Sequence, residues 1–113
     1  MLARLMGLDT LDPAALRRRM RDEPMTIIDV NSRSSWLAAH IPGARHLDPA
    51  TLQQSDLPAE RDRALVFYCS NPLCRKAPLA ARRARKMGFS AVLVLSAGIS
   101  GWVAAGMSTE SGG

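Results

Sequence analysis

Two cysteines five positions apart are the most reactive side chains of this chain. Cys69 ends an apolar run, Cys74 follows in a short loop, and Arg75 and Lys76 come directly after it. A thiol acts as a nucleophile in its thiolate form, which nearby cations and backbone N–H groups stabilise. The pattern therefore predicts Cys69 as a nucleophile, with the loop that follows it as a cradle for an anion.

The residues around Cys69 predict a strand followed by a helix. Residues 65–69 are apolar and rich in β-branched and aromatic side chains, whereas residues 77–87 form a helical pattern that ends before Gly88. Open α/β sheets bind ligands outside the carboxyl ends of their strands, so Cys69 is expected at a ligand-binding edge with its thiolate favoured. The alternative is that Cys69 is a small buried hydrophobic residue at a strand end.

Cys74 has two interpretations. As a second thiol, it could attack a persulfide or sulfenate on Cys69, release the sulfur and leave a disulfide for a thioredoxin-like reductant. The alternative is a loop side chain that fills space beneath the cradle. Cys69 and Cys74 would close only a small ring, so a disulfide between them would be a redox event rather than a structural framework.

The two histidines give little support for metal or acid–base chemistry. His40 lies beside a Pro-Gly turn, where a histidine most often hydrogen-bonds the local backbone, so a structural role is expected rather than that of a general base. Neither His40 nor His46 has a metal-ligand spacing relative to the cysteines. The sequence therefore predicts neither a metal nor another cofactor.

The composition indicates a single globular domain. The chain has 113 residues, of which 47% are hydrophobic, and no apolar run long enough for a membrane span. Residues 1–6 are too short for a signal peptide, so a cytoplasmic location is expected. The net charge is +5, but only 4% of the residues are aromatic, so neither a nucleic acid nor a membrane is expected as a partner. We predict one domain over residues 1–108 and a flexible tail over residues 109–113.

Predicted strands and helices alternate along the chain. Asp12 and Pro13 mark a helix start, and Trp102 is expected to anchor the core from a last short helix that begins at residue 97. The predicted strands are residues 25–30, 44–47, 65–69 and 91–95; the other predicted helices are residues 13–21, 34–39 and 77–87, with a helical turn at 50–54. This alternation predicts an α/β domain with a mainly parallel sheet.

Three separated motifs resemble those of the rhodanese-like sulfurtransferase family. The first comprises Ile27-Ile28-Asp29-Val30, Trp36 and His40-Ile41-Pro42-Gly43-Ala44, the second is Val66-Phe67-Tyr68-Cys69, and the third comprises Gly88-Phe89 and Gly98-Ile99-Ser100-Gly101-Trp102. They follow the order of the family's motifs and cover most of the chain. The resemblance implies the rhodanese-like fold, an α/β architecture whose central, mainly parallel sheet is flanked by helices on both faces.

The resemblance also implies an activity. A cysteine of this family takes a sulfane sulfur from an anionic donor such as thiosulfate, holds it as a persulfide and passes it to a thiophilic acceptor. Cys69 would be the nucleophile and persulfide carrier, and Cys74 the resolving thiol. The residues expected to bind substrate are Ser70, Asn71, Pro72, Leu73, Arg75 and Lys76, with Arg75 as the main anion-recognition side chain. The expected partners are a small anionic sulfur donor and a thiol acceptor or thioredoxin-like reductant.

The loop after Cys69 departs from the family pattern and leaves alternatives open. It contains no glycine, and Asn31 stands where the family usually has arginine. The spacing Cys69-x5-Arg75 fits dual-specificity phosphatases, so a phosphatase or arsenate reductase is one alternative, although no aspartic general acid is evident near the loop. A non-catalytic binding module, in which the loop and the basic helix contact a partner, is the other.

Overall fold

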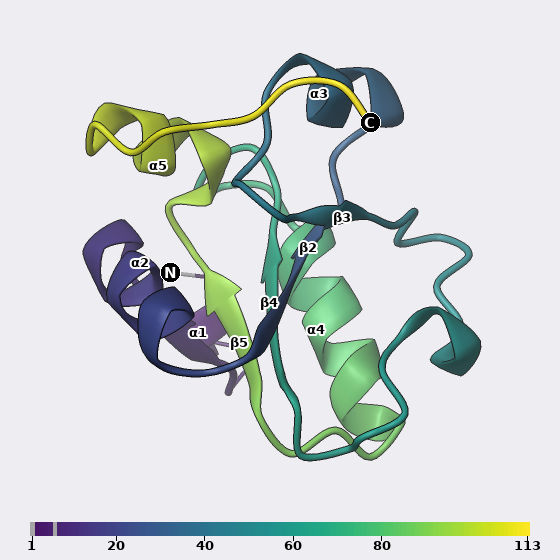
Figure 1. The fold of residues 1–113 in the computed structure, drawn as a ribbon. Coiled ribbons are helices and arrows are strands. Elements are labelled where there is room, and N and C mark those ends of the chain that lie inside the picture. Colours follow the sequence, from purple (N-terminus) through teal and green to yellow (C-terminus); the bar gives the residue numbers. More distant parts are fainter. Residues whose placement is uncertain (1, 6) are drawn as a thin grey trace.

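The computed structural model describes residues 2–5 and 7–113, which form a central sheet flanked by helices (Figure 1). Within the described residues the sheet has five strands in the order β1-β5-β4-β2-β3, and every neighbouring pair is parallel. The strands are β1 (Asp9–Leu11), β2 (Met25–Asp29), β3 (Arg45–His46), β4 (Ala64–Tyr68) and β5 (Val92–Leu95). The predicted α/β class with a mainly parallel sheet is confirmed.

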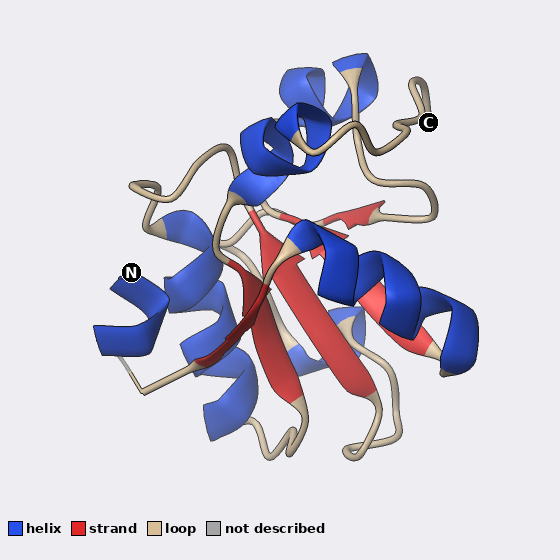
Figure 2. Ribbon diagram, turned by 90° about the vertical axis from the view of Figure 1, so that its left-hand side faces the viewer, coloured by secondary structure: helices blue, strands red, loops and turns tan. Residues whose placement is uncertain are grey.

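Helices cover both faces of the sheet, as the side view in Figure 2 makes clear. The helices are α1 (Leu2–Leu5), α2 (Pro13–Asp22), α3 (Arg33–Ala38), α4 (Lys76–Lys86), α5 (Gly98–Ala104) and the short 3₁₀ helix η1 (Gln54–Asp56). α1 and α4 pack on one face, whereas α2 and α5 pack on the other. No described helix is long and apolar enough to span a membrane.

The central strand β4 has two buried faces. Successive side chains of a strand point to opposite sides, so Leu65 and Phe67 pack towards α4, whereas Val66 and Tyr68 pack towards α2 and α5. All five residues of β4 are buried, which explains why its sequence is continuously apolar rather than alternating. The predicted core position of Trp102 is also confirmed.

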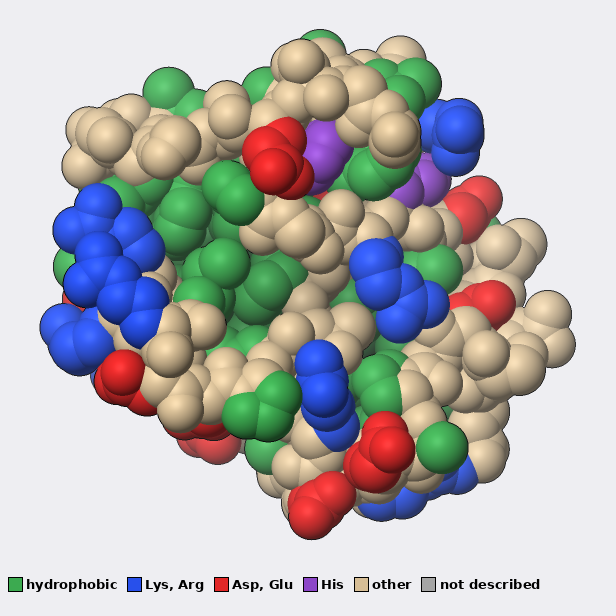
Figure 3. Space-filling model, in the orientation of Figure 1, with side chains coloured by type: hydrophobic (Ala, Val, Ile, Leu, Met, Phe, Trp, Pro, Cys, Tyr) green, Lys and Arg blue, Asp and Glu red, His purple; other side chains and the backbone are tan. Residues whose placement is uncertain are grey.

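One face of the sheet keeps a partly open apolar hollow, which Figure 3 shows beside α2 with Lys and Arg side chains along its edge. Partly buried side chains that pack on this face include Met20, Met25 and Met107. Arg17 and Arg21 of α2 line a pocket next to the buried Trp102. α2 therefore covers this face only in part.

The carboxyl ends of the parallel strands meet at one edge of the sheet. Asp29 ends β2 and Cys69 follows β4 at this edge. The start of α5 is tied to the same edge, because Ile99 N–H donates to the Cys69 carbonyl at 2.9 Å and Ser100 N–H donates to the Ser70 carbonyl at 3.0 Å. Three segments far apart in the sequence thus converge around Cys69.

Two parts of the fold differ from the sequence prediction. The strand β1 and the helix α1 were not predicted, because each has only three or four residues and shows no periodicity. The helical turn predicted at residues 50–54 is wrong in position. Asp48 accepts a hydrogen bond from Ala50 N–H and holds a turn there, and the 3₁₀ helix begins only after Gln53, whose N–H donates to Asp56.

The C-terminal residues 109–113, for which the sequence predicts a flexible tail, lie beside α3 in the structure. The backbones of His40 and Glu110 exchange two N–H to carbonyl hydrogen bonds of 2.9 and 2.8 Å, and Gly112 N–H donates to the Leu37 carbonyl at 2.8 Å. This segment therefore contributes acceptors and donors to the surroundings of His40.

Candidate functional site

Cys69 lies directly after β4, as predicted, and its side chain is buried with an exposed fraction of 3%. It belongs to the hydrophobic cluster beneath α4, and its thiol donates to the Cys74 carbonyl oxygen at 3.6 Å. The chain needs no special backbone conformation to place it, since the strand simply ends there. Cys69 is thus held rigidly at the base of the loop of residues 69–75, which we call the Cys69 loop.

The Cys69 loop is shaped by Asn71. Its side-chain Oδ1 accepts a hydrogen bond from Leu73 N–H at 2.9 Å, and its carbonyl accepts one from Cys74 N–H at 3.1 Å. These two N–H groups are therefore used within the loop and do not face an incoming anion. The sequence carried a signal for this turn, because asparagine followed by proline favours side-chain capping of its own turn.

The N–H groups that face the two sulfurs come from the ends of the loop. Ser70 and Ala77 present their backbone N–H groups to the Cys69 sulfur, and Ser70 and Lys76 present theirs to the Cys74 sulfur. Lys76 and Ala77 are the first residues of α4, where N–H groups lack partners within the helix. The predicted cradle of residues 70–75 is therefore shifted towards the start of α4.

Burial, together with a smaller contribution from Cys74, raises the pKa of the Cys69 thiol to about 12. The N–H groups of Ala77 and Ser70 act against this shift but do not offset it. The expectation that Cys69 itself favours the thiolate is thus wrong for the sulfur-free protein. The buried position beneath α4, which the sequence does not reveal, is the reason.

The pKa of Cys74 is lowered instead. Its partial burial acts to raise the pKa, but hydrogen bonds with the Cys69 thiol, with Lys76 N–H and with Ser70 outweigh that effect. The two pKa shifts are opposite in direction, so Cys74 loses its proton more readily than Cys69. Cys74 is placed to accept the Cys69 proton when Cys69 reacts.

The remaining predicted substrate-binding residues line the outer surface of the loop. Pro72 and Leu73 form its exposed tip, and the Leu73 side chain is 87% exposed. Arg75 is the N-cap residue of α4 and is exposed. Lys76 is also exposed and borders a pocket that contains His46. Both cations are thus exposed at the start of α4, and neither is paired with a carboxylate of a described residue.

Gly98 begins the last part of the third family-like motif, and the structure shows a positioning role for it that the sequence analysis did not predict. Its φ is +67°, and a Cβ atom there would lie 2.6 Å from the Asn71 nitrogen and from the Ser70 carbonyl carbon. Only glycine permits this close approach between the start of α5 and the Cys69 loop. Gly98 thus fixes the shape of the Cys69 loop on the side that faces α5.

Asp29 and Tyr68 support the neighbouring loop after β2. Asp29 is fully buried, and its Oδ1 accepts a hydrogen bond from Asn31 N–H at 2.8 Å. Tyr68 accepts a hydrogen bond from Ile41 N–H at 3.1 Å, and burial and the adjacent Asp29 carboxylate raise its pKa. Both groups are therefore structural and hold the backbone next to the site.

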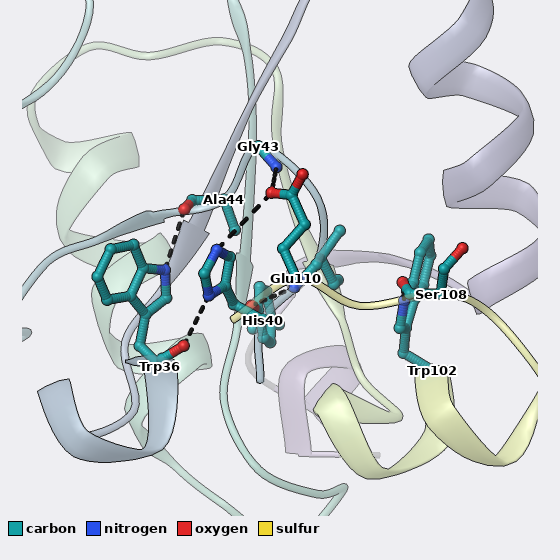
Figure 4. Close-up of polar contacts among 9 residues, drawn as sticks. Trp36, His40, Gly43, Ala44, Trp102, Ser108 and Glu110 are labelled. Carbon is teal, nitrogen blue, oxygen red and sulfur yellow. Dashed lines mark hydrogen bonds and ion pairs between the residues drawn. The ribbon is translucent and has the colours of Figure 1, made fainter. Parts of the chain in front are cut away.

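His40 is held in a separate network, drawn in Figure 4. Its Nδ1 lies 2.6 Å from the Trp36 carbonyl oxygen, and its ring stacks on the Trp36 indole at a centroid distance of 4.5 Å. Its Nε2 lies 3.8 Å from the Glu110 carboxylate, which also accepts a hydrogen bond from Gly43 N–H. The expected structural role of His40, with a hydrogen bond to the local backbone, is confirmed.

His46 also bonds a backbone carbonyl, that of Asn31, at 2.7 Å. Across residues 2–5 and 7–113, no group of three His, Cys, Asp or Glu side chains is arranged to hold a metal ion. The reactive groups that the described structure brings together are therefore the two thiols and the N–H groups at the start of α4.

Comparison with known proteins gives a consistent picture. Residues 12–105 match the family model of the rhodanese-like domain. The HTH-type transcriptional regulator Rv0324 of Mycobacterium tuberculosis is 35% identical over 92% of this chain and 46% of its own length. The chain spans about half the length of the curated relatives it matches.

Two solved structures bear on the chemistry. The structure of thiosulfate sulfurtransferase from Pseudomonas aeruginosa has a TM-score of 0.80 and 30% identity, and the match covers 93% of this chain and 20% of that chain. A protein of unknown function from Rhodopseudomonas palustris, described as a possible tyrosine phosphatase, has a TM-score of 0.74 and 25% identity, covering 93% of this chain and 86% of that chain. The descriptions of these two neighbours name different activities, so similarity of fold does not determine the reaction.

Proposed function

The chain belongs to the rhodanese-like domain family, and we propose that it is a sulfurtransferase that carries a sulfane sulfur as a persulfide on Cys69. The observation that supports this most directly is the site at the end of β4, where N–H groups of Ser70 and Ala77 face the Cys69 sulfur. Similarity to a named thiosulfate sulfurtransferase supports thiosulfate-like anions as donors.

Loading begins with transfer of the Cys69 proton to the Cys74 thiolate. The Cys69 thiolate then attacks the outer sulfur of thiosulfate and forms a new S–S bond. The S–S bond within the donor breaks, and sulfite leaves with its electron pair. Arg75 and Lys76 at the mouth attract the anionic donor, while the N–H groups at the start of α4 stabilise the charge on the sulfurs.

Unloading has two routes. An external thiolate can attack the outer sulfur of the persulfide, so that the acceptor gains the sulfur and Cys69 leaves as a thiolate. Alternatively, Cys74 gives the proton it took during loading to the outer sulfur of the persulfide, and the Cys74 thiolate attacks the inner sulfur. The S–S bond of the persulfide breaks, a disulfide forms between the two cysteines, and the outer sulfur leaves as hydrosulfide. The second route requires a dithiol reductant of the thioredoxin type to restore both thiols.

Two features favour sulfur transfer over phosphate hydrolysis. A Cys-x5-Arg phosphatase needs loop N–H groups and the arginine to converge on a tetrahedral oxyanion. Here Asn71 binds the N–H groups of Leu73 and Cys74, and Arg75 lies exposed at the N-cap of α4. A sulfane sulfur is smaller and needs only the donors that face Cys69.

Intact-mass measurement of the reduced protein after exposure to thiosulfate tests the proposal. We expect wild type to gain one sulfur atom, Cys69→Ser to gain none, and Cys74→Ser to gain one without forming an internal disulfide. Sulfur retained by Cys69→Ser but lost by Cys74→Ser would transfer the carrier role to Cys74. No sulfur from any sulfane donor, together with hydrolysis of an aryl phosphate that Arg75→Ala abolishes, would establish the phosphatase instead.

A further inference from the structure

A groove runs along the outer side of α4 from Lys76, the residue that follows the Cys69 loop in sequence. Its volume is about 550 Å³. It is lined by Pro49, Ala50, Lys76, Leu79, Ala80, Arg82, Arg83 and Lys86. Lys76, together with Pro49 and Ala50, also lines a second pocket that contains Asn31 after β2, so the groove reaches the carboxyl edge of the sheet. An α-helix of 11 residues such as α4 extends for about 16 Å, which is far longer than a small inorganic anion.

The second wall of the groove is fixed by Arg83. Its guanidinium donates to the Pro49 carbonyl at 2.7 Å and to the Leu52 carbonyl at 2.8 Å. The segment that faces α4 is therefore tied to the helix rather than free to close over it. The groove is a built feature of the fold, and Arg83 is one of its structural parts.

The rim of the groove carries positive charge that the described residues do not neutralise. Lys76, Arg82 and Lys86 are exposed, and no carboxylate of a described residue lies within 4.0 Å of any of them. Three like charges along one helix face raise the local potential and attract anionic partners. Basic residues that only promoted solubility would not need to surround a groove.

The floor of the groove is apolar. Leu79 is 49% exposed within it, and Ala80 is buried beneath it. A leucine left open between cations is suited to an apolar side chain of a partner, since charged rims around apolar centres are typical of protein interfaces. A nucleic acid backbone would use the charges but not the leucine.

We propose that this groove binds an acidic, amphipathic segment of a protein whose thiol receives the sulfur from Cys69. The proposal rests on the proposed sulfur transfer and names the class of its acceptor. Carboxylates of the segment pair with Lys76, Arg82 and Lys86, while an apolar side chain packs on Leu79. The partner thiolate attacks the outer sulfur of the persulfide, the S–S bond to Cys69 breaks, and Cys69 leaves as a thiolate.

The test compares two peptide acceptors in single-turnover transfer. One synthetic peptide carries Glu and Leu at helical spacing and one Cys, and the matched peptide carries Gln in place of every Glu. Protein loaded with thiosulfate is mixed with each peptide, and the sulfur on Cys69 is followed by mass spectrometry. We expect the acidic peptide to accept sulfur roughly tenfold faster at low salt, with the advantage lost at high salt.

Charge reversal in the groove provides the variants. Arg82→Glu combined with Lys86→Glu is expected to remove the advantage of the acidic peptide, while loading by thiosulfate and transfer to glutathione stay unchanged. Arg18→Glu combined with Arg17→Glu on α2, which packs on the opposite face of the sheet, makes the same change in net charge as a matched control. Leu79→Ser, which keeps every charge, is expected to slow the acidic peptide by about threefold to tenfold.

Several outcomes would overturn the proposal. Equal rates for the two peptides, or an equal loss in the α2 control, would show that the groove does not select the acceptor. Displacement of the acidic peptide by a DNA duplex, with the same dependence on Arg82 and Lys86, would assign the groove to nucleic acid instead. If Cys69 takes no sulfur at all, the proposed sulfur transfer is wrong, whether or not the groove binds the peptide. Fluorescence anisotropy of the labelled acidic peptide with unloaded protein then measures binding in the groove by itself.

Discussion

The Cys69 loop and the turn at His40 each hold a buried side chain that could act in catalysis, with exposed fractions of 3% and 5%. Burial does not distinguish them, but the partners of their polar atoms do. His40 has its Nδ1 on a backbone carbonyl and its ring against Trp36. Its Nε2 faces the Glu110 carboxylate, which is the one charged group paired with His40 among the described residues. Cys69 instead donates to the Cys74 carbonyl oxygen at 3.6 Å, lies beside the Cys74 thiol and faces N–H groups that can stabilise a negative charge.

The reactive side chain is therefore distinguished by the partners of its polar atom, and not by its exposed fraction. A histidine fixed by a backbone acceptor and a stacked indole is part of the packing. A thiol that lies beside a second thiol of lower pKa has an acceptor for its proton within the site. The two regions therefore respond differently to substitution, one in sulfur chemistry and the other in stability.

The largest effect is expected from Cys74→Ser on the rate of loading. Because Cys74 accepts the Cys69 proton in the proposed loading step, Cys74 must first be ionised, and its lowered pKa sets the pH at which the wild type becomes active. Without it, Cys69 must lose its proton to solvent against a pKa that burial raises. We expect loading at neutral pH to slow by about tenfold to a hundredfold.

The pH–rate profile of persulfide formation checks this prediction. Wild type should gain activity as the pH rises through a value below 9.0, whereas Cys74→Ser should gain activity only above 9.0. Mutant and wild-type profiles that rise at the same pH would show that Cys74 does not accept the proton. His40→Asn serves as the control, since it alters a titratable group outside the site.

The second-largest effect is expected from a substitution at Gly98, where the start of α5 contacts the Cys69 loop. Gly98→Ala places a methyl group 2.6 Å from the Asn71 nitrogen, so the Cys69 loop must shift away from the start of α5. We expect loading to fall by about tenfold and the free energy of unfolding to fall by about 2–3 kcal/mol. Urea unfolding and the loading rate measure the two losses.

Gly106 offers a matched control for that substitution. It has a similar φ of +79°, but nothing lies within 4 Å of a Cβ atom added there. Gly106→Ala should therefore cost about 1 kcal/mol in unfolding free energy through backbone conformation alone and leave loading unchanged. Equal loss of loading in both variants would show that contact with the Cys69 loop is not the cause.

The sequence predicts the strand and helix around Cys69 to within one residue at each end. The reason is local, since a buried central strand is continuously apolar and α4 is bounded by its own turn residues. β1 could not be predicted in the same way, because its three residues are held by pairing with β5 rather than by their own pattern. The missed elements are those whose formation depends on distant segments.

The same distinction between local pattern and distant contacts applies to the candidate site. The position of Cys69 follows from the end of its strand, but the protonation of the two thiols depends on burial and on which sulfur each N–H group faces. The need for Gly98 likewise arises from a contact with Asn71 that is 27 positions away in the chain. Composition and spacing contain no information on such contacts.

A smaller effect, confined to stability, is expected at the His40 turn. His40→Ala removes a buried ring, its hydrogen bond to the Trp36 carbonyl and its stacking on the indole. We expect the free energy of unfolding to fall by about 2–3 kcal/mol, with loading by thiosulfate changed less than about twofold. Urea unfolding gives the first value, and a loading rate reduced as much as in Gly98→Ala would contradict the separation of the two regions.

The smallest effect is expected from Glu110→Gln, which tests the pairing of the Glu110 carboxylate with His40 Nε2. The amide keeps an oxygen that can accept from Gly43 N–H, as the carboxylate does at 3.0 Å, and the backbone bonds with His40 are unaffected. Only the charge is lost, and it lies on an exposed side chain 3.8 Å from His40 Nε2. Screening by solvent limits such a pair to less than about 0.5 kcal/mol, so unfolding should be nearly unchanged at low salt. A loss of more than 1 kcal/mol that high salt removes would mean that the ion pair, rather than the backbone and the indole, fixes His40, because salt weakens charge pairing and leaves packing intact.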